Sequence, residues 1–159
     1  MNKEVKHYAI FTTNRDFAKE YIDSFKNKEK YNNNKVHEYR NNTHELVCYM
    51  EDGSWFQWFK SEVNCLGRRC NHAVIDLSTC SLDYIKKVIS PMCVEFGKRT
   101  FEIAYSKDKE YDLSEFIELL QKIKFIKGNI PVYYYNYDSS MQYCFSPVVN
   151  EQGLNLHGD

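Results

Sequence analysis

Arginine and aspartate stand near the two ends of the segment Gly67-Arg68-Arg69-Cys70-Asn71-His72-Ala73-Val74-Ile75-Asp76-Leu77. The guanidinium of arginine is a planar fork of donors that binds carboxylate or phosphate groups at two points. An aspartate that ends a buried strand lies where ligands bind in open α/β sheets, at the carboxyl ends of the strands. One function that the segment predicts is therefore a nucleotide-binding or nucleotide-cleaving site that uses Asp76 with Arg68 or Arg69.

The parts that would complete such a site are missing from the sequence. No glycine-rich phosphate loop of the form GxxxxGK[ST] occurs in the 159 residues, so neither its backbone N–H groups nor its lysine are present to hold the phosphates. Asp76 is followed by Leu77, which can neither accept a proton nor orient a water molecule. We therefore expect a protein that is not an enzyme and has no cofactor.

Cysteine and histidine form a second group of reactive side chains. Cys65, Cys70 and His72 have the spacing C-x4-C-x-H, and Cys80 could supply a fourth ligand for tetrahedral zinc. The spacing differs from the usual paired zinc knuckle, so buried thiols and a hydrogen-bonded histidine are the favoured interpretation, and no metal is expected. No two of the five histidines have metal-ligand spacing, and no G-x-S-x-G motif is present.

Aromatic residues are concentrated in Ser54-Trp55-Phe56-Gln57-Trp58-Phe59. Side chains alternate between the two faces of a strand, so aromatic rings must occupy both faces. Exposed Trp55, Trp58 and Phe59 beside Arg68 and Arg69 would form a protein-binding surface, because aromatic and arginine residues are enriched at interfaces. A helix or the C-terminal segment covering the outer face is the alternative.

These side chains must be positioned by alternating strands and helices. Strands are predicted at residues 8–12, 45–50, 54–59, 72–77, 100–105 and 132–137, with a weaker one at 35–39. Asp52-Gly53 predicts a tight hairpin turn between the second and third of these. Helices are predicted after Thr13, after Ser81 and between Asp112 and Gly128, from apolar residues at helical spacing and from capping residues at their ends.

This order of elements predicts a single α/β domain over residues 1–146, with a mainly parallel central sheet, an antiparallel hairpin and helices packed on the sheet. Residues 147–159 are predicted to form a polar C-terminal tail.

The same order resembles the core of phage terminase-like and helicase-like P-loop ATPases. The segments that carry the resemblance are Phe11-Thr12-Thr13 with Arg15, Glu51-Asp52-Gly53-Ser54, Gly67-Arg68-Arg69, Val74-Ile75-Asp76 and Ile103-Ala104-Tyr105-Ser106. The resemblance implies that Asp76 stands where those motors hold magnesium and Ser106 where they sense the nucleotide. Since the phosphate loop and the catalytic glutamate are lacking, it implies a scaffold that has lost the chemistry.

The net charge of the chain limits the kinds of partner that it can bind. Lysine and arginine number 21 against 22 aspartate and glutamate, so binding to nucleic acid would need a local patch such as Arg68 and Arg69. The first residues are polar and no long apolar run occurs, so we expect a cytoplasmic protein without membrane contact. The sequence favours a phage or mobile-element protein that binds and inhibits a larger nucleic-acid-processing machine, for example a host defence nuclease. A protein partner is expected, and nucleic acid is the alternative.

Overall fold

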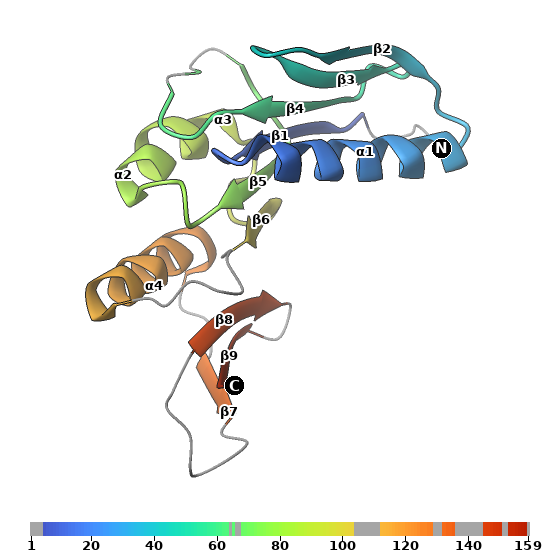
Figure 1. The fold of residues 1–159 in the computed structure, drawn as a ribbon. Helices are drawn as coiled ribbons and strands as arrows, with labels where there is room; N and C mark the ends of the chain where they lie inside the picture. Colours follow the sequence, from blue (N-terminus) through green and yellow to red (C-terminus); the bar gives the residue numbers. More distant parts are fainter. Residues whose placement is uncertain are drawn as a thin grey trace.

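The computed structural model describes residues 5–63, 65, 68–103, 112–128, 132–135, 145–150 and 153–158. Its main sheet has six strands in the order β2-β3-β4-β1-β5-β6 (Figure 1). In chain order these are β1 (His7–Phe11), β2 (Val36–Asn41), β3 (Leu46–Met50), β4 (Trp55–Phe59), β5 (His72–Asp76) and β6 (Thr100–Ile103). Neighbouring strands from β4 through β1 and β5 to β6 are parallel, whereas β2, β3 and β4 are antiparallel. The protein is thus α/β, as predicted. The sequence predicted a mainly parallel sheet with an antiparallel hairpin, whereas the sheet is mixed, with three parallel and two antiparallel strand pairs.

The predicted hairpin is formed by β3 and β4. Gly53 in its turn has φ of 86°, a left-handed conformation that glycine adopts without strain. The Ser54 carbonyl accepts a bond from the Met50 N–H at 2.8 Å, and the Asp52 side chain accepts one from the Ser54 N–H at 2.9 Å. The Asp-Gly signal was therefore interpreted correctly.

One long helix covers one face of the sheet. Helix α1 (Arg15–Tyr31) packs Ala18 and Ile22 against apolar residues of β1, β3, β4 and β5. Its N-cap is Asn14, whose side chain accepts a bond from the Phe17 N–H at 3.1 Å. The sequence predicted Thr13 as this cap. The prediction was wrong by one residue, since Asn14 holds the cap position.

The other face is covered by shorter helical segments and one further helix. They are α2 (Leu82–Tyr84), the π-helical turn η1 (Ile85–Ile89), α3 (Ser90–Met92) and α4 (Leu113–Lys127). Ser81 caps α2, and Asp112 with Glu115 forms a reciprocal capping box on α4, as the sequence predicted. Residues of these segments form a second core with Ala9, Phe11, Ala73 and Ile75, which belong to β1 and β5.

Strand β2 is at one edge of the sheet. Its pairing with β3 shifts register between Val36 and Glu38, as at a β-bulge. His37, Arg40 and Asn41 of this strand are exposed. The edge therefore has an irregular backbone and polar side chains.

Three strands near the C-terminus form a separate sheet in the order β7-β9-β8. They are β7 (Val132–Tyr135), β8 (Phe145–Asn150) and β9 (Gly153–Gly158). The sequence predicted β7 as a strand of the central sheet, but it pairs in parallel with β9 instead. Most of β8 and all of β9 fall in residues 147–159, where a polar tail was predicted. The division into a domain and a tail at residue 146 stays a prediction.

Candidate functional site

The carboxyl ends of β1, β4 and β5 meet at one edge of the sheet, because these strands are parallel. Asp76 ends β5 there and is 5% exposed. One oxygen of its carboxylate accepts a hydrogen bond from the Thr12 hydroxyl at 2.7 Å. The other accepts bonds from the Ser78 backbone N–H at 3.0 Å and the Ser78 hydroxyl at 2.5 Å. Both carboxylate oxygens are therefore bound by the protein itself.

Hydroxyl side chains also join the loops that follow these three strands. The Thr13 N–H donates to Thr79 Oγ1 at 3.3 Å, and Ser61 Oγ lies 3.0 Å from Thr79 Oγ1. Glu62 accepts a bond from the Ser81 N–H at 2.7 Å. We name six of these residues the strand-end network: Thr12, Thr13, Ser61, Asp76, Ser78 and Thr79. Their polar groups form hydrogen bonds with one another across the loops. This network therefore holds the loops together.

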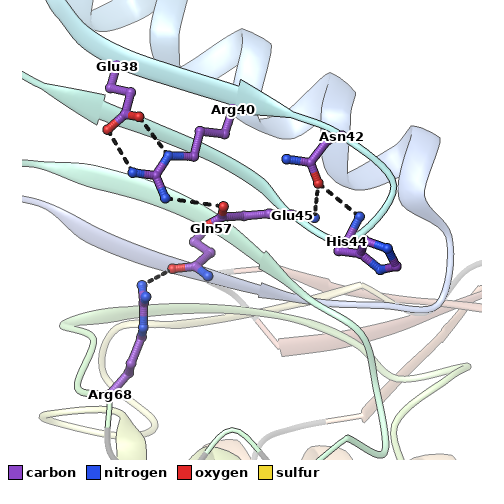
Figure 2. Close-up of polar contacts among 7 residues, drawn as sticks. All are labelled: Glu38, Arg40, Asn42, His44, Glu45, Gln57 and Arg68. Carbon is purple, nitrogen blue, oxygen red and sulfur yellow. Dashed lines mark hydrogen bonds and ion pairs between the residues drawn. The ribbon is translucent and has the colours of Figure 1, made fainter.

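Arg68 lies over β4 and away from the strand ends. Its guanidinium donates to Oε1 of Gln57, a buried residue in the middle of that strand (Figure 2). Gln57 stands opposite Ala9 of β1, and Ala9 stands opposite Ala73 of β5, three residues before Asp76. At about 3.3 Å per residue, Gln57 and Asp76 differ by about 10 Å along the strand direction, and they are also two strands apart.

The structure therefore does not bring Arg68 and Asp76 into one site. Arg69, the other arginine of the pair, is exposed. Ser106, the proposed nucleotide sensor, lies outside the described residues. Of the described residues of the nucleotide site that the sequence suggested, Asp76 alone is at the strand ends.

The aromatic residues predicted to bind a partner are divided between the two faces of the sheet. Trp55 stacks on His7 with ring centroids 5.1 Å apart, and Phe59 stacks on Phe11 at 5.4 Å. Both pack against the core beneath the short helices. Trp58, three residues after Trp55, packs against the core beneath α1. Positions three apart in a strand face opposite sides, so the two tryptophans cannot share one surface.

All three rings are half-buried rather than freely exposed. The indole Nε1 of Trp58 donates to the Thr12 carbonyl at 2.8 Å, and the Arg15 guanidinium lies 5.8 Å from its ring centroid. The structure thus favours the alternative that helices cover the aromatic strand. Trp55 and Phe59 thus pack on one face of the sheet and Trp58 on the other, and their role in binding a partner stays a prediction.

The antiparallel part of the sheet carries several polar side chains on one face. Two cross-strand rows run over β2, β3 and β4 on the face away from α1: Glu38, Tyr49 and Trp55 in one, Arg40, Val47 and Gln57 in the other. Figure 2 shows Glu38, Arg40 and Gln57 in front of the sheet, with α1 behind it. Among the described residues, the core on this side includes no residue of β2 or β3. We name Glu38, Arg40, Val47, Tyr49 and Gln57, together with Arg68, the arginine face.

Arg40 is held in place at the centre of this face. Its guanidinium donates to both carboxylate oxygens of Glu38, at 2.6 and 3.1 Å, and to Glu45 at 3.3 Å (Figure 2). These hydrogen bonds lower the pKa of Glu38. The guanidinium also lies 6.0 Å from the ring centroid of Tyr49. Two sequence signals for this face were available. Polar residues alternate at Glu38 and Arg40, and Gln57 interrupts the aromatic run.

The Cys and His residues considered for zinc are dispersed. Cys80 Sγ lies 3.1 Å from Ser61 Oγ, and burial raises the pKa of its thiol to about 12. The His72 ring stacks on Tyr8 at 4.3 Å. Cys65 Sγ lies 3.4 Å from the Met92 sulfur. Over the described ranges, no three or more His, Cys, Asp and Glu side chains are arranged to hold a metal ion.

Comparison of the sequence with models of protein families, with curated proteins and with solved structures finds no match. The resemblance to terminase-like and helicase-like ATPases therefore stays a prediction. In the part of the chain that the structure describes, no helix has both the length and the apolar character needed to cross a membrane.

Proposed function

We propose that this protein is a non-enzymatic binding protein of phage or mobile-element origin that docks on a larger nucleic-acid-processing machine, such as a host defence nuclease, and inhibits it. The docking surface is the arginine face together with Arg69. The observation that carries the proposal is the pair of exposed arginines beside a sheet face whose β2 and β3 residues, in the part of the chain that the structure describes, pack against no helix of the core on that side.

The charges of this surface favour an acidic partner. Arg68 and Arg69 make no ion pair with any carboxylate in the described residues, whereas Arg40 is neutralised by Glu38 and Glu45. Two guanidinium groups are thus available to bind carboxylates of another molecule. Arginine binds carboxylates at two points and is enriched among the residues that dominate binding energy.

The hydrogen bonds of Asp76 support the proposal that the protein has no catalytic activity. Its two oxygens accept three internal hydrogen bonds, so most of the acceptor capacity of the carboxylate is used within the protein. The resemblance to motor ATPases that lack their phosphate loop supports the choice of partner class. A chain that keeps such a scaffold without the chemistry is suited to occupying a surface of a related machine.

Charge reversal at Arg68 should abolish partner capture. We expect Arg68→Glu to reduce recovery of the bound machine from a host lysate at least tenfold, because it replaces an attraction to carboxylates with repulsion at the centre of the surface. The measurement is affinity capture followed by quantitative mass spectrometry. The matched control is Lys87→Glu, which reverses an exposed charge on η1, at 72% side-chain exposure, and should leave capture unchanged.

Two outcomes would contradict this proposal. Equal recovery with wild type and Arg68→Glu would remove the arginine face as the docking surface. Loss of capture after nuclease digestion of the lysate would show that the bound molecule is nucleic acid, held through phosphates rather than carboxylates.

Nucleotides provide the test against the competing activity. We expect no change in melting temperature on adding ATP, GTP or their diphosphates with Mg²⁺, since Arg68 and Asp76 are in separate places. A rise in melting temperature that disappears in Asp76→Asn would support a nucleotide site at the strand ends and would reject the binding protein as stated.

A further inference from the structure

Two cysteines from separate segments lie side by side on the core beneath the short helices. Cys70 ends the loop before β5, and Cys93 follows α3. The Cys70 N–H donates to the Met92 carbonyl at 3.0 Å, and the Val94 N–H donates to the Cys70 carbonyl at 2.9 Å. This is the pattern of a parallel bridge, which sets Cys70 directly opposite Cys93. Paired backbones lie about 4.8 Å apart, within the range of about 4.4 to 6.8 Å between α-carbons that a disulfide spans.

The two thiols also influence each other's ionisation. Their interaction lowers the pKa of Cys93 and raises the pKa of Cys70. Burial raises the pKa of both thiols, and Thr100 and the positive charge of Arg99 act on Cys93 in the opposite direction. Both residues are buried, with Cys93 at 6% exposure and Cys70 at 1%, and the next residue after Cys93, Val94, is 49% exposed. We therefore expect Cys93 to react first.

We propose that Cys70 and Cys93 form a reversible intramolecular disulfide when the protein meets a peroxide or a small-molecule disulfide. With a small disulfide, the Cys93 thiolate attacks one of its sulfurs and releases the other as a thiolate. Cys70 then loses its proton and attacks the Cys93 sulfur of the mixed disulfide, which releases the second small thiol. The two electrons lost by the cysteine pair reduce the small disulfide to two thiols.

The other described cysteines are placed less favourably for this reaction. Cys80 is bonded to Ser61, and the pKa of its thiol is raised to about 12 by burial. Cys48 is buried on the opposite face of the sheet, beneath α1, and burial raises the pKa of its thiol. Cys65 faces the Met92 sulfur, which cannot form a disulfide, and burial raises its pKa too. Among the cysteines that the structure describes, oxidation should therefore be selective for the 70–93 pair.

The disulfide would fasten the end of the segment that carries Arg68 and Arg69 to the helical segment before Val94. In the reduced protein this connection is noncovalent and includes the two bridge hydrogen bonds. Formation of the disulfide does not depend on the proposed function. It gives that segment a covalent anchor under oxidising conditions.

Thiol mapping on the folded protein tests the proposal. Wild-type protein is treated with oxidised glutathione, its remaining thiols are alkylated in denaturant, and its peptides are identified by mass spectrometry. We expect a linked peptide containing Cys70 and Cys93 as the main product, reversed by dithiothreitol. The oxidised form should melt higher by more than about 5 °C, because the link constrains the unfolded chain between the two cysteines.

Two variants serve as controls. Cys48→Ser should retain both the linked peptide and the rise in melting temperature, and Cys93→Ser should lose both. Full alkylation of Cys70 and Cys93 after oxidation of the wild type, or a main product that joins Cys65 to either of them, would overturn the proposal. These outcomes are read from the wild-type protein, so they hold even if a variant folds poorly, and they are independent of partner capture.

Discussion

Asp76→Ala should destabilise the domain by about 3 kcal/mol or more, because it removes a buried acceptor of three hydrogen bonds, two of them from side-chain hydroxyls. Thr12 is 0% exposed, so its hydroxyl would lose the acceptor for its proton without access to water, although its oxygen would still accept the bond from the Asn14 N–H. Chemical denaturation followed by circular dichroism measures the loss directly as a lower free energy of unfolding.

The matched substitution is Asp76→Asn, which keeps the size of the side chain. Its amide oxygen can still accept the bonds from Ser78, and its amide nitrogen can donate to the Thr12 hydroxyl, which is also an acceptor. We expect a smaller loss of about 1 kcal/mol. If Asp76→Ala were as stable as the wild type, the strand-end network would have no structural role, and a ligand-binding role for Asp76 would become the better explanation.

Trp58→Ala should lower the free energy of unfolding by about 2 to 3 kcal/mol, below the range for fully buried tryptophan because the ring is half-buried. The substitution removes packing against the core beneath α1 and the hydrogen bond to the Thr12 carbonyl. Equilibrium denaturation again measures the effect. Trp58→Phe should recover most of the packing and lose only the hydrogen bond, at a cost of about 1 kcal/mol.

The sequence alone suggested the opposite for this ring, namely weaker partner binding with the fold intact. A folded Trp58→Ala variant with wild-type stability but lost partner capture would restore that view. Trp58 would then belong to a docking surface on the α1 side of the sheet rather than to the arginine face.

Local chemical signals were sufficient to predict the strands of the main sheet and the helices that pack on it. The Asp-Gly turn, the serine before α2 and the acidic cap of α4 act within four residues of their targets, so their effect can be deduced from neighbouring letters of the sequence. The buried strand ending in Asp76 was recognisable from its continuous apolar run. Alternation also required aromatic rings on both faces of β4, which the structure confirms.

Contacts between distant segments could not be predicted in this way. Whether a helix covers Trp55 or Trp58 depends on the order of strands in the sheet, which no local pattern determines. The bond from Arg68 to Gln57 depends on the path of the loop between β4 and β5. Cys70 and Cys93 become neighbours only because β5 and the end of α3 meet in three dimensions. The polar composition of residues 147–159 also concealed the pairing of β8 with β9, although Leu154 and Leu156 alternate with polar residues there.

The shifted register of β2 has a consequence for self-assembly. A regular open edge would let a second copy extend the sheet by adding a strand, the route by which many β-proteins aggregate. The irregular backbone at Val36 to Glu38 interrupts the ladder that an incoming strand would need. The protein can thus keep β2 at the border of the sheet with less tendency to add a strand from a second copy.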